Sequence, residues 1–154
     1  MPNAGGNGLE SEFASAEDST GLMLWRVTNA WQAAQRAALR PFDLTHVQFV
    51  LLASLAWLDN DAPTTQRELS RHAGTDPMMT SQVLRTLERK NLVERRGHPT
   101  DARAKVLRAT QQGAELAGIA NAAVEAVDRR FFTPLGAERA AFTGMLRAVL
   151  SPAS

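Results

Sequence analysis

The side chains best suited to chemistry in this sequence share one face of a helix predicted between Asp76 and Lys90. With ~100° per residue, the apolar residues of this segment fall on one side and define its buried face. The buried face comprises Met79, Val83, Leu84 and Leu87, and the opposite face comprises Met78, Ser81, Gln82, Arg85 and Arg89. In a DNA major groove, arginine pairs with guanine, glutamine pairs with adenine, and an apolar group contacts the thymine methyl. The exposed face therefore predicts a surface that reads base edges.

A second basic element follows this helix directly. Asp101 and Arg103 are two residues apart, so at the start of an extended strand they would share a face. The carboxylate would then hold the guanidinium in one orientation for a narrow minor groove, while Arg95, Arg96 and Lys105 contact phosphates. Taken alone, a weak surface ion pair is the simpler interpretation of this pair. Its position after a DNA-reading helix favours the DNA interpretation.

Basic charge is concentrated in the middle of the chain. Residues 66–108 hold ten Lys/Arg and five Asp/Glu, a local +5, whereas the remainder holds seven and eleven, a local −4. The whole chain carries only +1. A basic lobe of this kind is typical of a protein that binds a polyanion, although a solvated face produces the same pattern less often.

Two capping boxes mark helix starts upstream of these elements. Thr45 and Gln48 are spaced to cap each other's backbone at the start of an apolar, buried helix reaching about residue 58. Thr65 and Glu68 repeat the pattern before a short helix that Gly74 ends. Thr65 and Gln66 at this second start join the candidate DNA contacts.

The basic helix and the segment after it complete a recognisable order of elements. Asp76 and Pro77 suit the first turn of the helix, and Asn91 suits the left-handed position that ends it. The stretches "LVERR" and "KVLRA" predict two short strands joined by the turn "GHPTDA". Two helices followed by a two-stranded ribbon predict a winged helix-turn-helix, in a mainly α fold with a small β-wing (α+β). An unremarkable α+β domain of merely packed short helices is the alternative.

Further helices are predicted on either side of this lobe. One covers residues 22–39 and is stopped by Pro41, and another covers residues 136–150. A long helix over residues 111–132 ends before Pro134. Its expected apolar stripe comprises Leu116, Ile119, Ala123, Val127 and Phe131.

These helices carry more apolar surface than one subunit can cover, so we expect an isologous dimer. The residues behind this expectation are Leu24, Trp31, Val127, Phe131, Phe142, Leu146 and Val149.

The run "ELSRHAGTDPMMTSQVLRTLERKNLVERRGHPTDARAKVLRAT", with a following Gly113, resembles the MarR family of winged-helix transcription regulators. The most specific part of the resemblance is the D-x-R motif at Asp101 and Arg103. Asn91 stands where the family usually has glycine, and Ala109 where it usually has leucine. The resemblance implies a dimer with interlocking terminal helices, Arg103 in the minor groove braced by Asp101, and Ser81, Gln82 and Arg85 on the recognition helix.

The expected domain organisation follows from these elements. Residues 1–20 are rich in Gly, Asn, Ser and Glu and are expected to be a disordered tail. Residues 21–154 form the MarR-like domain, with dimerisation helices in 22–42 and 111–150 and the DNA-binding lobe in 45–110. A dimer would place two recognition helices one duplex turn apart, about 34–36 Å, which predicts a pseudo-palindromic operator in double-stranded DNA.

The resemblance also implies a small aromatic effector held between the dimer helices and the DNA lobe. The candidate pocket residues are Trp25, Trp31, His46, Phe49 and Trp57, although each is more simply explained as a core residue. With no cysteine and no close His/Glu spacing, no metal and no cofactor are expected. The chain also lacks a catalytic constellation, so it is not expected to be an enzyme.

We therefore expect a cytoplasmic, ligand-responsive repressor that binds DNA as a homodimer. The apolar run "FVLLASLAWL" is too short to span a bilayer, and no secretory signal is visible at the start. The alternative is a winged-helix module that binds another protein rather than DNA. An apolar or acidic face on the helix at residues 76–90 would favour that alternative, whereas the face predicted here is basic.

Overall fold

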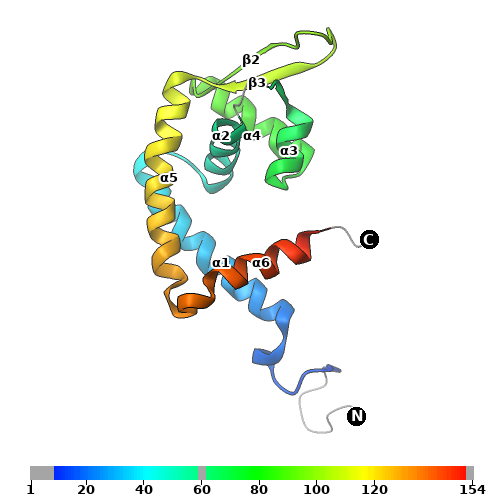
Figure 1. Ribbon diagram of the computed structural model, residues 1–154, viewed down its shortest axis with the longest axis vertical. Coiled ribbons are helices and arrows are strands. Elements are labelled where there is room, and N and C mark those ends of the chain that lie inside the picture. The colour runs from blue at the N-terminus through cyan, green and yellow to red at the C-terminus, as the bar shows by residue number, and fades with distance from the viewer. Residues whose placement is uncertain (1–8, 59–61, 152–154) are drawn as a thin grey trace. The chain divides into compact units, whose positions relative to one another are not determined.

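The computed structural model describes residues 9–58 and 62–151, which fold into helices and one small antiparallel sheet (Figure 1). The α-helices are α1 Thr20–Leu39, α2 His46–Leu58, α3 Gln66–Ala73, α4 Pro77–Arg89, α5 Gln111–Phe131 and α6 Arg139–Leu150. The strands are β1 Thr64–Thr65, β2 Val93–Gly97 and β3 Lys105–Ala109, and short 3-10 helices are η1 Ala16–Asp18, η2 Arg40–Phe42 and η3 Thr133–Glu138. The expected mainly α fold with a small β-wing is confirmed.

The described residues divide into two compact units, one ending at Ala34 and the other beginning at Gln35. The first contains η1 and most of α1, whose first turn is capped by the Ser19 hydroxyl accepting from the Leu22 N–H at 3.2 Å. Of the tail expected over residues 1–20, residues 1–8 lie outside the described residues. The rest includes η1, and α1 begins at Thr20 rather than at Leu22.

In the second unit, local capping sets the helix boundaries as predicted. The Gln48 N–H donates to the Thr45 hydroxyl and the Thr45 N–H donates to the Gln48 side chain, both at 3.2 Å, which completes the box before α2. Thr65 and Glu68 form the same reciprocal pair before α3, at 2.9 and 3.2 Å. Gly74 ends α3 with φ of 67°, a left-handed conformation that glycine adopts without strain.

The core of this unit is built around α2. Its residues Phe49, Leu51, Leu52 and Leu55 are buried, and α2 packs against α3, α4, α5 and β3. Leu69, Leu84, Leu87, Leu92 and Leu107 belong to the same apolar cluster. Because α2 is surrounded in this way, an almost wholly apolar sequence is what its position requires. The arrangement fixes α3 and α4 relative to the sheet.

The sheet has three strands in the order β1–β3–β2, all antiparallel. The pair β2–β3 is the predicted hairpin, with Arg95 opposite Leu107 and Gly97 opposite Lys105. The two-residue strand β1 was not predicted, because so short a segment carries no alternation of apolar and polar residues. Thr64 and Thr65 pair with Leu107 and Val106, so β1 attaches the start of α3 to the middle of β3.

The apolar stripe predicted on α5 is not the face of this helix that is buried in the structure. The buried residues of α5 are Gly113, Ala117, Ala120, Val124 and Val127, and only Val127 belongs to the predicted stripe. Ile119 is 61% exposed. Small side chains allow α5 to approach α2 closely, whereas the prediction selected the larger apolar residues. Leu116 still packs against the core, whereas Ile119 remains available for contacts outside this unit.

No residue of α6 is buried, and Met145, Leu146, Val149 and Leu150 are all exposed. Helix α6 begins at Arg139 rather than near Gly136, because Gly136 has a non-helical φ of 52° inside η3.

Among the described residues, no single helix is long and apolar enough to cross a bilayer, and only the bent pair Thr20–Phe42 and His46–Leu58 meets that test when joined.

Candidate nucleic-acid interface

The exposed face of α4 carries the side chains expected to read DNA. Met78 is 72% exposed, Gln82, Arg85 and Arg89 are exposed, and Ser81 is partly exposed. Leu84 and Leu87 are fully buried on the opposite face. The Asp76 carboxylate accepts from the Met79 N–H at 2.9 Å, and Pro77 occupies the first turn, so the helix starts where the sequence predicts. Asn91 follows its end with φ of 59°, as predicted.

The buried face of α4 differs from the prediction at two positions. Met79 is 47% exposed, and Thr80 is fully buried in its place. The Thr80 hydroxyl lies 2.8 Å from the Asp76 carbonyl oxygen, 2.7 Å from the Thr75 hydroxyl and 3.3 Å from the Ser70 hydroxyl. Burial of a hydroxyl is tolerated when its hydrogen bonds are made in this way. A polar cluster, rather than apolar packing, therefore fixes the turn between α3 and α4.

The N-terminal end of α3 carries the two remaining helical candidates. The Thr65 hydroxyl is occupied by its capping bond to the Glu68 N–H. Gln66, the first residue of α3, is half-buried, and its side-chain oxygen accepts from the Arg95 Nη1 at 3.0 Å. The amide group of Gln66 is thus oriented by a residue of the hairpin.

Arg95 on β2 links three elements. Its guanidinium forms an ion pair with the carboxylate of Glu88, near the end of α4, as well as its bond to Gln66 on α3. Both side chains of the ion pair are 29% exposed. The sequence predicts that Arg95 contacts phosphates. Its contacts with Glu88 and Gln66 instead favour a role in positioning α3, α4 and the hairpin. Glu88 was missed, and the only signal for it was its place at the edge of the basic face.

The other candidates on the hairpin are exposed. Arg96 pairs with Glu94 at 2.8 Å, a contact between exposed side chains that contributes little to stability. Lys105 opens β3 and is exposed, and so is Arg103 in the turn before it. Figure 1 shows this hairpin and its turn extending away from the bundle of α2, α3 and α4.

The predicted geometry of Asp101 and Arg103 is wrong. Both residues lie in the turn between β2 and β3, not at a strand start. The Asp101 carboxylate accepts from the backbone N–H of Arg103 at 3.0 Å, and the Asp101 carbonyl accepts from the Ala104 N–H at 3.2 Å. Asp101 therefore shapes the backbone that carries Arg103. An Asp two residues before a turn residue commonly does this, because its short side chain reaches the backbone.

His98 also organises this turn and was not among the predicted site residues. Its Nδ1 accepts from the backbone N–H groups of Thr100 and Asp101, at 3.2 and 3.1 Å. The backbone N–H of His98 donates to the Ala104 carbonyl at 3.2 Å. The sequence signal was a histidine at the start of a turn rich in Pro, Thr and Asp.

Of the five residues proposed for an effector pocket, two belong to the first unit and three to the second. Trp25 and Trp31 lie on the part of α1 in the first unit, with Trp25 67% exposed. Phe49 is buried in the core of the second unit, and Trp57 is 77% exposed. His46 opens α2 and is partly buried. Burial lowers the pKa of His46, and the positive charge of Arg36 lowers it further, against the opposing effect of Asp128.

Residues 44–105 match the model of the MarR family. Over 123 residues the chain is 42% identical to the uncharacterized HTH-type transcriptional regulator YdcH of Bacillus subtilis (strain 168), covering 79% of this chain and 84% of that protein. Over 117 residues it is 34% identical to the HTH-type transcriptional repressor Rv2887 of Mycobacterium tuberculosis (strain ATCC 25618 / H37Rv), covering 76% and 82%.

Two solved structures extend this likeness to three dimensions. The Rv2887 complex with salicylic acid has a TM-score of 0.68 at 33% identity and covers 88% of this chain and 99% of that one. CouR from Rhodococcus jostii RHA1, bound to p-coumaroyl-CoA, has a TM-score of 0.74 at 25% identity and covers 90% and 93%. The likeness therefore extends well beyond the segment that the family model matches.

Proposed function

The chain belongs to the MarR family of winged-helix transcription regulators, and on that premise we propose that it is a homodimeric repressor of a pseudo-palindromic operator. Its relatives are regulators of transcription, and the class of function is sequence-specific DNA binding. We place its site of action in the cytoplasm, with no catalytic activity of its own.

The observation that carries this proposal is the exposed face of α4. That face presents Gln82, Arg85 and Arg89 to solvent, and the hairpin held by Arg95 projects from the same unit. A protein-binding module would need an apolar or acidic face at this position. A basic face with one amide and one thioether instead suits the donor and acceptor pattern of a major groove.

Individual roles follow from where the side chains lie. Arg85 and Gln82 contact base edges, with Ser81 and Met78 beside them, and Arg103 enters the minor groove from the turn of the hairpin. Exposed cations on either side contact phosphates, which adds affinity but no sequence information. This last group comprises Arg89, Arg96 and Lys105, with Thr65 and Gln66 at the start of α3 as further contacts.

The homodimer is supported by apolar side chains that each unit leaves exposed. In the second unit these include Ile119 on α5 and Met145 and Val149 on α6, and in the first unit Leu24 and Val27 on α1. Leu24 and Val27 are three residues apart on α1, and Met145 and Val149 are four apart on α6, so each pair shares one face of its helix, and exposed apolar faces of this kind mark contact surfaces. A second copy of the chain is the simplest partner, because a two-fold interface pairs the same surface on both copies. The terminal helices, 22–42 and 111–150, thus form the dimer, and residues 45–110 form the DNA lobe.

A small aromatic effector is the natural regulator by analogy with Rv2887, whose solved complex contains salicylic acid. The candidate residues for such a ligand are Trp25, Trp31, His46, Phe49 and Trp57. Of these, Phe49 belongs to the core cluster, so the other four carry this part of the proposal.

Selection of bound fragments from a random DNA pool tests the proposed function. We expect recovered sites to contain two inverted half-sites with centres about 34–36 Å apart, about one duplex turn. Sedimentation of the free protein should show a dimer. Recovery of one unrepeated half-site together with a monomer in solution would contradict the proposal.

A further inference from the structure

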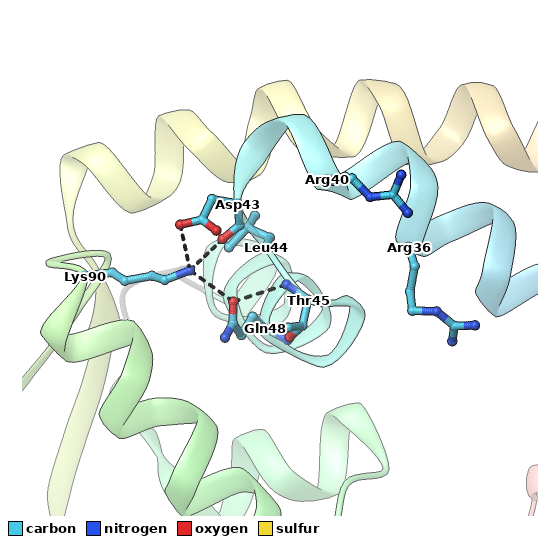
Figure 2. Close-up of a pocket in the computed structure, with 7 residues that line it drawn as sticks. All are labelled: Arg36, Arg40, Asp43, Leu44, Thr45, Gln48 and Lys90. Atoms are coloured by element: carbon cyan, nitrogen blue, oxygen red, sulfur yellow. Dashed lines mark hydrogen bonds and ion pairs between the residues drawn. The ribbon is translucent and has the colours of Figure 1, made fainter.

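A pocket of about 410 Å³ lies where the end of α1, η2, the start of α2 and the end of α4 meet (Figure 2). Its lining comprises Arg36, Arg40, Asp43, Leu44, Thr45, Gln48 and Lys90. Three of these side chains are basic and one is acidic, so the lining carries a net charge of +2. The volume falls within the range of pockets that hold small molecules, roughly 300–1,000 Å³.

One cation of the pocket comes from the recognition helix. Lys90 is the C-cap residue of α4, and its Nζ donates to the Asp43 carbonyl at 2.5 Å and to the Gln48 side-chain oxygen at 3.3 Å. It also lies 3.5 Å from the Asp43 carboxylate. Asp43 itself has a left-handed φ of 53° in the connection between η2 and α2. Lys90 therefore ties the end of α4 to the start of α2.

The other two cations have no such tie. Arg36 and Arg40 are four residues apart, so they lie on one side of the helical segment, and both side chains are exposed. Within residues 9–58 and 62–151, neither forms an ion pair. Figure 2 shows both guanidinium groups on the opposite side of Gln48 from Lys90. The field of Arg36 also reaches His46, since it contributes to lowering the pKa of that residue.

We propose that this pocket binds a small dianion, a phosphomonoester or a dicarboxylate, through Arg36, Arg40 and Lys90. A net lining charge of +2 is matched by two negative charges, and a bound dianion offsets the repulsion among the like charges of the lining. Arginine offers paired N–H donors to a phosphate or carboxylate, and Lys90 adds a third cation. The site contains no aromatic side chain, so charge, not ring stacking, governs its choice of ligand.

The contact between Lys90 and Asp43 links the pocket to DNA binding, and this part of the proposal rests on the proposed function. A dianion in the pocket competes with Asp43 for Lys90 and so weakens the contact that holds the end of α4. A ligand shifts an equilibrium only by its differential affinity for two states, and here the difference is the exchange of Asp43 for the ligand as the partner of Lys90. Operator affinity should therefore fall when the pocket is filled.

Calorimetric titration of the full chain with three ligands, each built on one benzene ring, tests the site. The probes are phenyl phosphate and phthalate, both dianions at pH 8, and benzoate, a monoanion, at equal ionic strength. The dianions should bind about tenfold more tightly than benzoate, because a second charge engages a second cation. Equal affinities for the three probes would overturn the charge argument. A preference for phenyl phosphate over phthalate identifies a phosphomonoester, and the reverse a dicarboxylate, as the better ligand.

Variants locate the binding. Arg36→Gln and Arg40→Gln should each weaken the dianions about tenfold and leave benzoate nearly unchanged. Arg129→Gln, an exposed arginine at the far end of α5, is the matched control and should bind all probes like the parent. If Arg40→Gln binds phenyl phosphate like the parent, the assignment of the pocket is wrong. Thermal unfolding of each variant confirms that the fold is kept.

Lys90→Gln tests the link to DNA separately. In the parent, saturating phenyl phosphate should weaken operator binding about fivefold or more, and in Lys90→Gln the effect should disappear. A full effect in Lys90→Gln overturns the coupling. The two proposals fail differently: a chain that binds no DNA but prefers dianions loses the proposed function, whereas a chain that binds DNA and shows no such preference loses only this site.

Discussion

The guanidinium of Arg95 on β2 is ion-paired with the carboxylate of Glu88 near the end of α4, so the hairpin and the recognition helix are fastened to each other. The same guanidinium donates to Gln66 at the start of α3, at 3.0 Å. Three elements that would approach DNA are thus held by one side chain. Such a contact orients neighbouring groups without itself needing to reach the duplex.

This arrangement predicts what replacing Arg95 does. Arg95→Gln should weaken operator binding several-fold, because Gln66 and the hairpin lose a common anchor, and should lower the free energy of unfolding by about 1–2 kcal/mol. The slope of log affinity against log salt should stay close to that of the parent, because no phosphate contact is lost. A decrease of about 1 in the magnitude of that slope, measured by fluorescence anisotropy, would instead identify Arg95 as a phosphate contact.

Gly113 is predicted to be irreplaceable by alanine. A Cβ at this position would lie 2.0 Å from the carbonyl oxygen of Leu92. Gly113 lies in the first turn of α5, and Leu92 lies between α4 and β2. Gly113→Ala should therefore lower the free energy of unfolding by about 3 kcal/mol or more, measured by denaturant titration. Gly118→Ala on the same helix is the control, since its Cβ would meet nothing within 4 Å. That variant should be stabilised by about 0.5–1 kcal/mol. Similar results for both variants would refute the close approach.

His98 is predicted to act through the turn of the hairpin. His98→Ala removes the acceptor of two backbone N–H groups, so the amides of Thr100 and Asp101 should exchange faster with solvent and operator binding should weaken about threefold. His98→Asn, which keeps a short-range acceptor, should recover part of both effects. Unchanged amide exchange in His98→Ala would show that the turn is held by other contacts.

The lowered pKa of His46 predicts a response to acid. The unfolded chain takes up the proton near the ordinary value of 6.5, whereas the folded chain takes it up at a lower pH. The unfolded state therefore binds more protons as the pH falls through 6.5, and the free energy of unfolding decreases until the folded pKa is passed. His46→Gln should reduce this loss between pH 7 and pH 5, measured by denaturant titration at each pH. An equal loss in both proteins would assign the acid sensitivity to other groups.

Local signals in the sequence were enough to predict most of the fold. The caps at Thr45, Thr65 and Asp76 depend on bonds spanning three residues, so their spacing alone specifies where α2, α3 and α4 begin. The left-handed positions of Asn91 and Gly74 were also predictable, because a left-handed φ restricts which residue types occur there. The exposed face of α4 followed from helical periodicity.

What the sequence did not reveal depends on contacts between distant segments. The buried face of α5 is set by close packing against α2, which selects Ala117 and Ala120 over the larger Ile119. Thr80 is buried because Ser70 and Thr75 supply its hydrogen bonds from the preceding helix and turn. Arg95 was placed among surface cations because its partner Glu88 is on another element. In each case the deciding partner is not a neighbour along the helix or strand.

The most direct measurement of the DNA-reading surface is operator binding by Arg85→Ala and Arg103→Ala across a range of salt concentrations and single-base operator variants. Arg85→Ala should lose about 1–3 kcal/mol of binding free energy and relax base preference at one position of each half-site. Arg103→Ala should weaken binding and reduce the salt slope. Arg129→Ala is the control and should match the parent. If both test variants bind the operator as the parent does, with the same base preference and the same slope, α4 and the hairpin are not the surface that reads DNA.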